Sequence, residues 1–464
     1  MKQTRIAMAA MAAMAVAASA SAATEFDNFT PLLSSQTSPL PESAPVLLSS
    51  PLFTQEVIAN RSNQNTLVPG SNSGNWDMIT ANESGANAGR YLFMPFETGS
   101  AGVQRVDLWD TNYNTRTTTI VAPGTSSFVS GDASRWTPWG SYLTAEESWG
   151  ATSTKGRLFE VTNATTAVAN GGDLIHRSIV PRVSHEGLAF DSSNSLYFID
   201  EFNGGSLYKY VAANPNASTG NEYFTAGQTF VAKVDGGNNA NATGALTWEA
   251  ITDATGAPLS TSVIGVQGDI DGRLSANAVG GTDYMRPEDL EVIVNAAGQE
   301  VLYMATTTTH EIYAVNLSTN EVSLFANRDT LDLGNGQAVG AELTNPDNLA
   351  VDAEGNLYII EDQPGADRDD IWFARDLNHD GDLNDEGEGL QRWASNGIPG
   401  SEFTGMYFDK FNPNVTYVNI QHPNSGNDLL VKISAVPAVP EPSTYGLALA
   451  GLIVAGVMAR RRRA

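Results

Sequence analysis

Carboxylate side chains recur in this sequence where a β-rich run enters or leaves a loop. Carboxylates that converge on one point repel one another unless cations fill the space between them. Hard oxygen ligands suit Ca²⁺, Mg²⁺ or Mn²⁺, and iron also accepts carboxylates. We therefore predict a metal centre, and the alternative is that these residues are solvated loop ends of a very acidic protein. The carboxylates assigned to metal are Glu147, Glu186, Asp200, Glu201, Glu288 and Glu361.

A second acidic segment, residues 376–386, resembles an EF-hand calcium loop. Oxygen-bearing side chains fall at its positions 1, 3, 5, 7 and 9, and Gly381 occupies the sixth position, where the loop turns sharply. Gly387 stands where the usual twelfth-position Glu would be, so a neighbouring Glu would have to substitute. The segment predicts a structural calcium site, and the alternative is a simple acidic turn. The predicted ligands are Asp376, Asn378, Asp380 and Asp382.

Other catalytic groups are scarce. The sequence contains no cysteine, which excludes Cys nucleophiles, thiolate zinc sites and iron–sulfur clusters. It also lacks a GxSxG nucleophile elbow, a P-loop and a dinucleotide-binding fingerprint. His185 and His422 stand alone, and such histidines are more often hydrogen-bonded structural residues than ligands. The carboxylates are therefore the main candidates for chemistry.

The elements that must position these carboxylates repeat along the chain. A β-rich run, an Asp/Asn/Gly turn and a second run with a central aromatic residue recur, most clearly at 187–200 and 348–361. Six such units can be traced, with weaker copies at 90–121 and 139–161. Such units bury their faces only by stacking side by side, so we predict an all-β, six-bladed β-propeller. A jelly roll or a pair of β-sandwiches is the alternative, and we expect no amphipathic helix between residues 70 and 435.

The charge balance restricts the partners. The chain has 25 Lys and Arg against 52 Asp and Glu, a net charge of −27. Such a surface repels nucleic acid and anionic lipid, so neither is expected as a partner. A phosphate substrate would be repelled as well, unless bound cations reverse the field locally. We expect the protein to be a monomer.

Both ends of the sequence look like targeting signals. Residues 1–23 combine two basic residues, an apolar run and small-residue cleavage sites, as in a secretory signal peptide. Residues 437–464 combine a Pro-Glu-Pro, a short apolar run and four arginines, and resemble a PEP-CTERM signal cleaved by an exosortase. Residues 24–70 are expected to be an extended lead-in, and residues 71–436 the propeller.

These signals predict a protein exported by a Gram-negative bacterium. It would be held transiently at the inner membrane and then reach the cell surface or the extracellular matrix. The alternative for the tail is an ordinary C-terminal membrane anchor.

Several motifs in this order resemble the PhoX family of calcium- and iron-dependent alkaline phosphatases. The similar stretches run from about residue 90 to 435 and stand at residues 137–147, 184–187, 286–289, 346–349 and 418–423. The resemblance implies a propeller whose mouth holds calcium and iron and hydrolyses phosphate monoesters. It implies metal binding by Glu147, Glu186 and Glu288, and phosphate binding by Arg286.

The sequence departs from this family in two respects. Asp132 stands where PhoX enzymes have a Cys iron ligand, and a carboxylate there would move the site towards Ca²⁺ or Mg²⁺. The leader also lacks the family's twin arginines, so metal would be loaded after export. We expect calcium as the cofactor, with iron as the alternative.

Three functions are compatible with the sequence. The first is metal-dependent hydrolysis of small phosphate esters. The second is a non-catalytic, calcium-stabilised propeller that acts as an extracellular binding or matrix protein. The third is a propeller that hydrolyses another ester, such as a lactone, with calcium alone.

Overall fold

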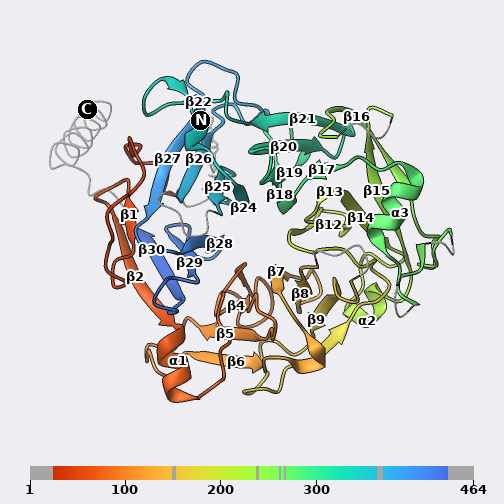
Figure 1. Ribbon diagram of the computed structural model, residues 1–464, viewed down its shortest axis with the longest axis horizontal. Helices are drawn as coiled ribbons and strands as arrows, with labels where there is room; N and C mark the ends of the chain where they lie inside the picture. The colour runs from red at the N-terminus through yellow and green to blue at the C-terminus, as the bar shows by residue number, and fades with distance from the viewer. Residues whose placement is uncertain are drawn as a thin grey trace, which may run out of the picture.

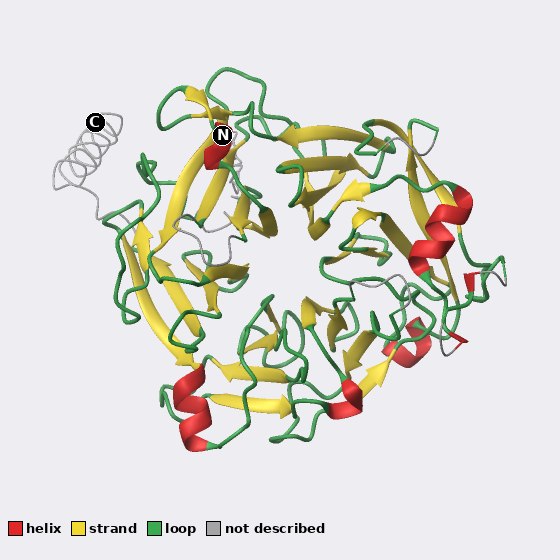
Figure 2. Ribbon diagram, in the orientation of Figure 1, coloured by secondary structure: helices red, strands yellow, loops and turns green. Residues whose placement is uncertain are grey.

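The computed structural model describes residues 24–148, 153–236, 240–260, 263–265, 268–362 and 369–436. Antiparallel sheets radiate from a common centre, and β7, β18, β24 and β28 lie nearest that centre (Figure 1). Strands and loops make up nearly all of the described chain, and the few helices lie at the outer rim (Figure 2). The all-β prediction is therefore confirmed. The predicted signal peptide and sorting tail lie outside the described residues.

The first two sheets each contain four strands joined in chain order. The first consists of β3 (Thr80–Ala81), β4 (Tyr91–Pro95), β5 (Val103–Asp107) and β6 (Thr117–Val121). The second consists of β7 (Gly131–Trp136), β8 (Tyr142–Glu146), β9 (Leu158–Val161) and β10 (Leu174–His176). These are the two weaker sequence repeats, and both form sheets.

Nine of the eleven strands from β11 to β21 form one continuous sheet, because two fans of strands meet at their outer edges. Its order is β11 (Leu188–Phe190), β12 (Leu196–Ile199), β14 (Leu207–Ala212), β15 (Gly227–Val234), β16 (Gly244–Ala250), β21 (Glu321–Ala326), β20 (Glu311–Asn316), β19 (Glu300–Thr306) and β18 (Pro287–Val294). The fans join through β16 and β21, where Gly244 lies opposite Val322. A small sheet of β13 (Asn203–Gly205) and β17 (Tyr284–Met285) also links them.

The last two sheets take in strands from both ends of the described chain. One contains β24 (Pro346–Val351), β25 (Leu357–Glu361), β26 (Asp370–Arg375) and β27 (Gly389–Asn396), with β22 (Leu331–Asp332), β23 (Gln337–Ala338) and β1 (Val46–Leu48) at its outer side. The other contains β28 (Glu402–Phe408), β29 (Val415–Gln421), β30 (Leu429–Ala435) and β2 (Phe53–Asn60). Because β2 pairs with β30, the ring is closed by hydrogen bonds between its first and last parts.

The segment predicted as an extended lead-in thus contributes strands β1 and β2 and helix α1 (Arg61–Leu67). Its early residue Phe26 is fully buried against Phe53 and Trp393. Two short helices, α2 (Gly220–Tyr223) and α3 (Gly272–Val279), lie where no amphipathic helix was expected. Neither they nor any other helix of the described residues has the length and apolar character to span a membrane.

The core lies between neighbouring sheets. Strand β25 is buried along its whole length, because one face meets the sheet before it and the other the sheet after it. On one side Tyr358 and Ile360 pack with Phe403 and Val418 of the next sheet. Each large apolar side chain buried in this way contributes roughly 1.5–3 kcal/mol. Packing on both faces thus fixes β25, and β24, at whose start Asp347 stands, pairs with it.

Candidate metal centre

An acidic residue stands at or just before the start of each inner strand. The inner strands are β3, β7, β11, β18, β24 and β28, each paired antiparallel with the strand that follows it in sequence. Since these strands begin at the same end of the ring, their acids gather there, and we call this place the acidic end. The residues are Asp77, Asp132, Glu186, Glu288, Asp347 and Glu402.

A repeated backbone turn determines the direction of these acidic side chains. The residue two positions before the acid has a positive φ in most of the repeats: Asn75 (49°), Ser130 (41°), Arg286 (55°), Asn345 (41°) and Gly400 (74°). Gly and Asn adopt this left-handed conformation readily, whereas Arg rarely does. Such strain persists where the surrounding structure holds it, often at functional positions.

In most of the repeats the same turn accepts a hydrogen bond from the residue that follows the second strand of the pair. Glu147 N donates to Ser130 O (2.9 Å), Glu201 N to Ser184 O (2.8 Å) and Asp362 N to Asn345 O (2.9 Å). Glu97 N donates to Asn75 O in the same way (2.8 Å). A second set of acids is thereby placed beside the first.

Three of these acids form a compact cluster. One carboxylate oxygen from each of Glu186, Glu288 and Asp347 lies within 4.8 Å of the other two. All three side chains are buried. Burial is the largest cause that raises the pKa of Glu186 and Asp347 well above the ordinary value, and neighbouring carboxylates raise it further. Burial also raises the pKa of Glu288, although Glu186 and Arg286 oppose this.

Further acids surround this cluster. Burial, followed by the charge of Glu147, raises the pKa of Asp77 to about 8. Burial also raises the pKa of Asp132, with Asp77 and Glu147 as the next causes. The pKa values of Glu97, Glu201 and Glu402 are raised by burial and nearby carboxylates in the same manner. So many anions in one buried place cannot all ionise without a compensating cation.

The donors present fit a hard metal ion. Several buried carboxylate oxygens lack a hydrogen-bond partner among the described residues: Asp132 Oδ1, Glu201 Oε2, Glu288 Oε2, Asp362 Oδ1 and Glu402 Oε2. Buried polar atoms are normally paired, so these oxygens are available as ligands. The donor set consists of oxygen atoms, which suits Ca²⁺, Mg²⁺ or Mn²⁺ better than a thiophilic metal.

Arg286 projects into this acidic end. Its Nη2 lies 2.5 Å from Glu201 Oε1 and its Nε 3.1 Å from Glu288 Oε1. Burial lowers the pKa of Arg286, but the charges of Glu288 and Glu201 outweigh it and raise the pKa above its usual range. A quarter of the side chain remains exposed, so a ligand can reach the guanidinium.

Two of the predicted metal ligands have other partners. Asp200 is buried and accepts two hydrogen bonds from Arg273 (2.5 and 2.6 Å). Glu361 is also buried and accepts from Thr344 N, Asp370 N and Trp372 Nε1. Both carboxylates thus belong to hydrogen-bonded networks within the sheets. The next residues in the sequence, Glu201 and Asp362, lie at the acidic end.

The analysis of the sequence did not single out Asp77, Glu97, Asp347, Asp362 and Glu402 as ligands. Aligning the repeats on their first strands would have found four of them. In three repeats the two acids are fifteen residues apart, at 132 and 147, 186 and 201, and 347 and 362. The alternation of side chains along a strand also distinguishes Asp362 from Glu361, because two consecutive side chains point to opposite faces.

The predicted calcium loop lies between β26 and β27 and not at the start of an inner strand. Asp376 accepts hydrogen bonds from Asp380 N (3.3 Å) and Gly381 N (3.1 Å), and Asn378 Nδ2 donates to Asp380 Oδ2 (2.9 Å). Glu388, which is buried, accepts from Leu377 N (2.9 Å). Asp382 caps the next turn by accepting from Asn384 N. The loop is held closed by these bonds, and its calcium ligation stays a prediction.

The two histidines differ in their surroundings. His185 is fully buried beside Phe198, and burial lowers its pKa to about 3, so it is neutral. His422 is partly exposed at the acidic end, where its Nε2 lies 2.8 Å from Glu402 Oε1.

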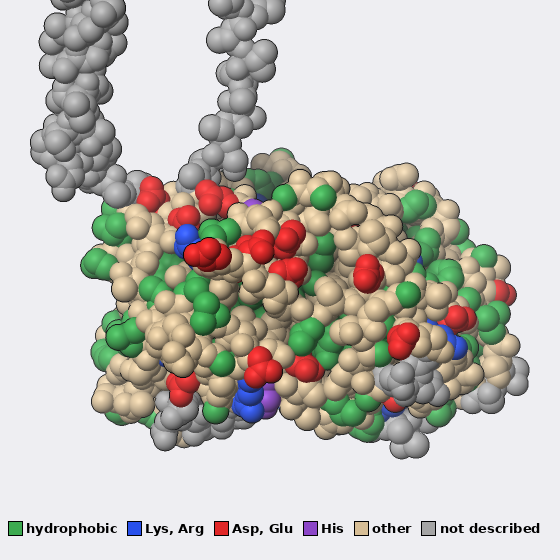
Figure 3. All heavy atoms as spheres, turned by 90° about the horizontal axis from the view of Figure 1, so that it is seen from above, with side chains coloured by type: hydrophobic (Ala, Val, Ile, Leu, Met, Phe, Trp, Pro, Cys, Tyr) green, Lys and Arg blue, Asp and Glu red, His purple; other side chains and the backbone are tan. Residues whose placement is uncertain are grey.

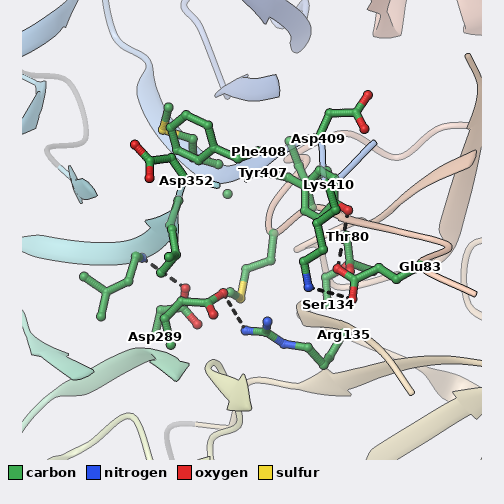
Figure 4. A pocket seen from close by; sticks show the side chains of 18 of the residues that line it. Thr80, Glu83, Ser134, Arg135, Asp289, Asp352, Tyr407, Phe408, Asp409 and Lys410 are labelled. Carbon is green, nitrogen blue, oxygen red and sulfur yellow. Dashed lines mark hydrogen bonds and ion pairs between the residues drawn. The ribbon is translucent and has the colours of Figure 1, made fainter. Parts of the chain in front are cut away.

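The other ends of the inner strands line a cavity of about 180 Å³. Charged groups occur here too, but they are paired: Arg135 with Glu291 (2.9 Å) and Lys410 with Glu83 (2.7 Å), as the dashed lines in Figure 4 show. Asp289 accepts hydrogen bonds from two backbone amides, its own neighbour Leu290 N and Leu349 N. We call this the paired end of the ring.

The outer surface is acidic as well. In the view of Figure 3, Asp and Glu side chains are spread over the molecule with few Lys and Arg among them. This agrees with the net charge of −27. Acidic residues at the surface are therefore common, and it is the buried, unpaired oxygens that distinguish the acidic end.

Comparison with solved structures supports a PhoX-like fold. Pseudomonas fluorescens PhoX, solved in complex with the transition-state analogue vanadate, superposes with a TM-score of 0.60 at 15% sequence identity, covering 86% of this chain and 98% of that one. A luciferin-regenerating enzyme gives a TM-score of 0.44 at 10% identity, over 83% of this chain and 96% of that one. No curated protein matches the sequence.

Two family models match the sequence itself. The PEP-CTERM protein-sorting motif matches residues 438–463, which indicates an exported protein sorted by an exosortase in a Gram-negative bacterium. The model for alkaline phosphatase PhoX matches residues 132–424 and so spans more than half of the chain. This protein belongs to the PhoX alkaline phosphatase family.

Proposed function

We propose that this protein is an exported, metal-dependent phosphatase that hydrolyses phosphate monoesters at the acidic end of its ring. The observation that carries the proposal is the buried cluster of Glu186, Glu288 and Asp347, with Arg286 next to it. A phosphate dianion would be repelled from these carboxylates alone. Substrate binding therefore requires cations in the same place, and the activity depends strictly on metal.

Calcium is the metal that we propose. Glu186, Glu288 and Asp347 would hold it, with Asp132, Glu147 and Glu201 as further oxygen donors in the surrounding group of acids. When bound, divalent metal supplies Lewis acidity that neutralises charge on the phosphoryl oxygens. Iron is the less favoured alternative, because Asp132 offers oxygen at the position where a thiolate would favour it.

Arg286 would bind and orient the phosphate. Its planar guanidinium matches two phosphate oxygens at once, which fixes the direction of the ester bond. Glu201 holds the guanidinium from one side, and the left-handed backbone at Arg286 directs it over Glu288. Asn348 links the cluster to the next sheet, because its Nδ2 lies 3.3 Å from Glu186 Oε1 and its Oδ1 accepts a hydrogen bond from Gly405 N.

The repeated pairs of strands support six blades, built on β3, β7, β11, β18, β24 and β28. The sorting motif supports processing by an exosortase, after brief attachment at the inner membrane and before release to the cell surface or extracellular matrix. We further propose that the protein acts as a monomer. The loop at 376–388 would bind a separate, structural calcium ion through Asp376, Asn378, Asp380 and Asp382.

The test uses secreted protein without residues 1–23 and 437–464. Hydrolysis of p-nitrophenyl phosphate is measured after chelation and after addition of Ca²⁺ or Fe³⁺, with bound metal quantified. We expect Ca²⁺ to restore activity. Arg286→Met should lower kcat/KM by about 10²–10³-fold with bound metal unchanged, as expected when an electrostatic group at the reacting phosphate is lost.

The matched control is Arg105→Lys, at a distant guanidinium that donates to the backbone of Ala164. It should leave the activity unchanged. Full calcium occupancy without hydrolysis of any phosphate monoester would refute the proposal and favour a non-catalytic, calcium-stabilised binding protein. Hydrolysis of lactones alone would favour the third function.

A further inference from the structure

Helix α3 belongs to no sheet, yet its second residue contacts a carboxylate next to the acidic end. The helix lies in the connection between β16 and β17, farther from the centre of the ring than β12 (Figure 1). Arg273 Nε and Nη2 donate to the two carboxylate oxygens of Asp200, at 2.6 and 2.5 Å. Asp200 directly follows β12 and is fully buried. Because its charge is buried, this carboxylate depends on the arginine for compensation.

The start of α3 is fixed in place. The side chain of Asp271 caps the helix by accepting a hydrogen bond from Leu274 N (2.9 Å). Gly272 N donates to Arg182 O (2.9 Å), and a Cβ atom on Gly272 would lie only 2.5 Å from Val183 Cγ1. The helix start therefore packs closely against the segment that leads into β11. Arg273 thus extends from a rigid base.

Arg273 contacts the residues on both sides of Glu201. It pairs with Asp200 on one side, and on the other its Cζ lies 3.8 Å from the centre of the Phe202 ring, where a cation is attracted to the aromatic face. Glu201 Oε1 accepts hydrogen bonds from Arg286 Nε (3.1 Å) and Nη2 (2.5 Å). Phe202 O accepts one from Arg286 N (3.2 Å). The side chain and the backbone of Arg286 are therefore both bonded to the segment that Arg273 holds.

The equivalent acids of two other repeats have partners within their own sheet. Glu146, at the end of β8, pairs with Arg157 (2.6 Å), which directly precedes β9. Glu361, at the end of β25, accepts a hydrogen bond from Trp372 Nε1 (2.9 Å) of β26. Asp200 instead pairs with a residue 73 positions later in the chain. The segment beside Arg286 thus depends on a helix outside the sheets.

From these contacts we infer that Arg273 is a positioning residue for Arg286, an inference that rests on the proposed function, in which Arg286 binds the phosphate. Arg273 acts through Glu201 and the carbonyl of Phe202, which together direct the guanidinium of Arg286. Lysine cannot replace it, because a compact ammonium lacks both the paired N–H groups and the flat face. A small displacement of a group that orients the substrate is sufficient to slow the reaction markedly.

The experiment compares variants of the calcium-loaded, secreted protein. Binding of inorganic phosphate is measured by calorimetry, and hydrolysis of p-nitrophenyl phosphate by steady-state kinetics. Arg273→Lys should weaken phosphate binding and lower kcat/KM roughly tenfold. Bound calcium should be unchanged, because Asp200 Oδ1 still accepts from Ser184 N and so holds the turn before Glu186. In an Arg286→Met background the same substitution should change phosphate binding by less than about twofold, as expected for a residue that acts through Arg286.

Two further variants complete the comparison. Asp200→Asn weakens the same pair from the other side and should weaken phosphate binding with bound calcium unchanged. Arg177→Lys is the matched control, because Arg177 is also buried, pairs with Glu160 of β9 (2.5 Å) and lies over the ring of Phe224 (5.4 Å). Strand β9 is the third strand of its sheet, so this substitution should leave phosphate binding unchanged. Circular dichroism reports whether each variant is folded.

The outcomes separate this inference from the proposed function. Undiminished phosphate binding by folded Arg273→Lys or Asp200→Asn, or an equal loss with and without the Arg286 side chain, would overturn the inference alone. So would a loss of bound calcium in Asp200→Asn, which would make Asp200 a metal ligand. Undiminished phosphate binding by Arg286→Met would overturn the role of Arg286 in the proposed function, and this inference with it.

Discussion

The two ends of the ring carry acidic residues on the same strands, yet the partners of these residues differ. Strand β18 shows this within five residues: Glu288 lies in the buried cluster with an unpaired Oε2, whereas Glu291 forms an ion pair with Arg135. At the paired end, Glu291 and Glu83 lie beside cations, and Asp289 accepts hydrogen bonds from two backbone amides, although burial and the charge of Glu291 raise its pKa to about 7. At the acidic end, the acids outnumber Arg286, the one arginine that the described residues place beside the cluster. The difference indicates that the pairing of acids, rather than their density, distinguishes the candidate metal centre from the rest of the ring.

The largest effect is expected from removing one acid at each end of β18. Glu288→Gln keeps the shape of the side chain but takes a charge from the buried cluster. It should lower kcat/KM on the order of 10³-fold and reduce bound metal, since ligand and electrostatic stabilisation are lost together. Steady-state kinetics and metal analysis by mass spectrometry provide the measurement.

Glu291→Gln is the matched control three residues along the same strand. It breaks the ion pair with Arg135 and should leave metal content and activity unchanged. Equal loss of activity in both variants would mean that the two ends do not differ in function, and the comparison would fail.

A second prediction concerns the choice of metal at the acidic end. Asp132→Cys replaces a buried oxygen donor by a thiol that soft metals prefer. We expect the ratio of iron to calcium in protein produced with both metals to rise roughly tenfold, as the softer donor favours iron. Ser134→Cys, on the same strand but bonded to Phe93 O and Tyr142, is the control and should not change the ratio. An unchanged ratio in Asp132→Cys would show that residue 132 is not a ligand.

Much of the fold could be predicted because the strands repeat. Alternating runs such as 187–200 and 348–361 carry their turn residues with them, and the structure forms hairpins there. The role of residues 24–70 was harder to predict, because β1 and β2 depend on pairing with strands more than 300 residues away. Helix α3 was missed because it is only eight residues long.

The chemical nature of the candidate site could be predicted from the sequence, but not all of the residues that form it. Glu186 and Glu288 were predicted because they stand in motifs, and the structure brings them together with Asp347. Asp200 and Glu361 were predicted as ligands from the clustering of acids in the sequence, which does not show the direction of each side chain, and Asp77 and Glu402 were not considered. The last residue of a strand and the residue after it point in different directions. The backbone turn at the end of the strand determines which of the two side chains faces the acidic end.

A third prediction is that the metal-free protein is less stable at high pH. Burial and neighbouring carboxylates raise the pKa of Asp77 from 3.8 to about 8, so the folded state binds more protons than the unfolded state between these values. Stability is therefore fully present below pH 3.8 and falls as pH rises towards 8. With chelator, we expect Tm to fall by roughly 5 °C between pH 5 and pH 8. Calorimetry with excess Ca²⁺ should abolish most of this fall, and a Tm that rises with pH in chelator would contradict the electrostatic account.

The smallest effect is expected at the paired end. Lys410 is 60% exposed, so its ion pair with Glu83 is screened by solvent and contributes only about 0.2–1 kcal/mol. Lys410→Met should accordingly change the free energy of unfolding by no more than about 1 kcal/mol, measured by urea denaturation, and leave bound calcium unchanged. Glu83 remains partly exposed at the rim and can be hydrated when its partner is lost, unlike the buried acids at the other end. A loss of calcium in Lys410→Met would show that the two ends are coupled through the inner strands, and the paired end would then be part of the metal centre's support.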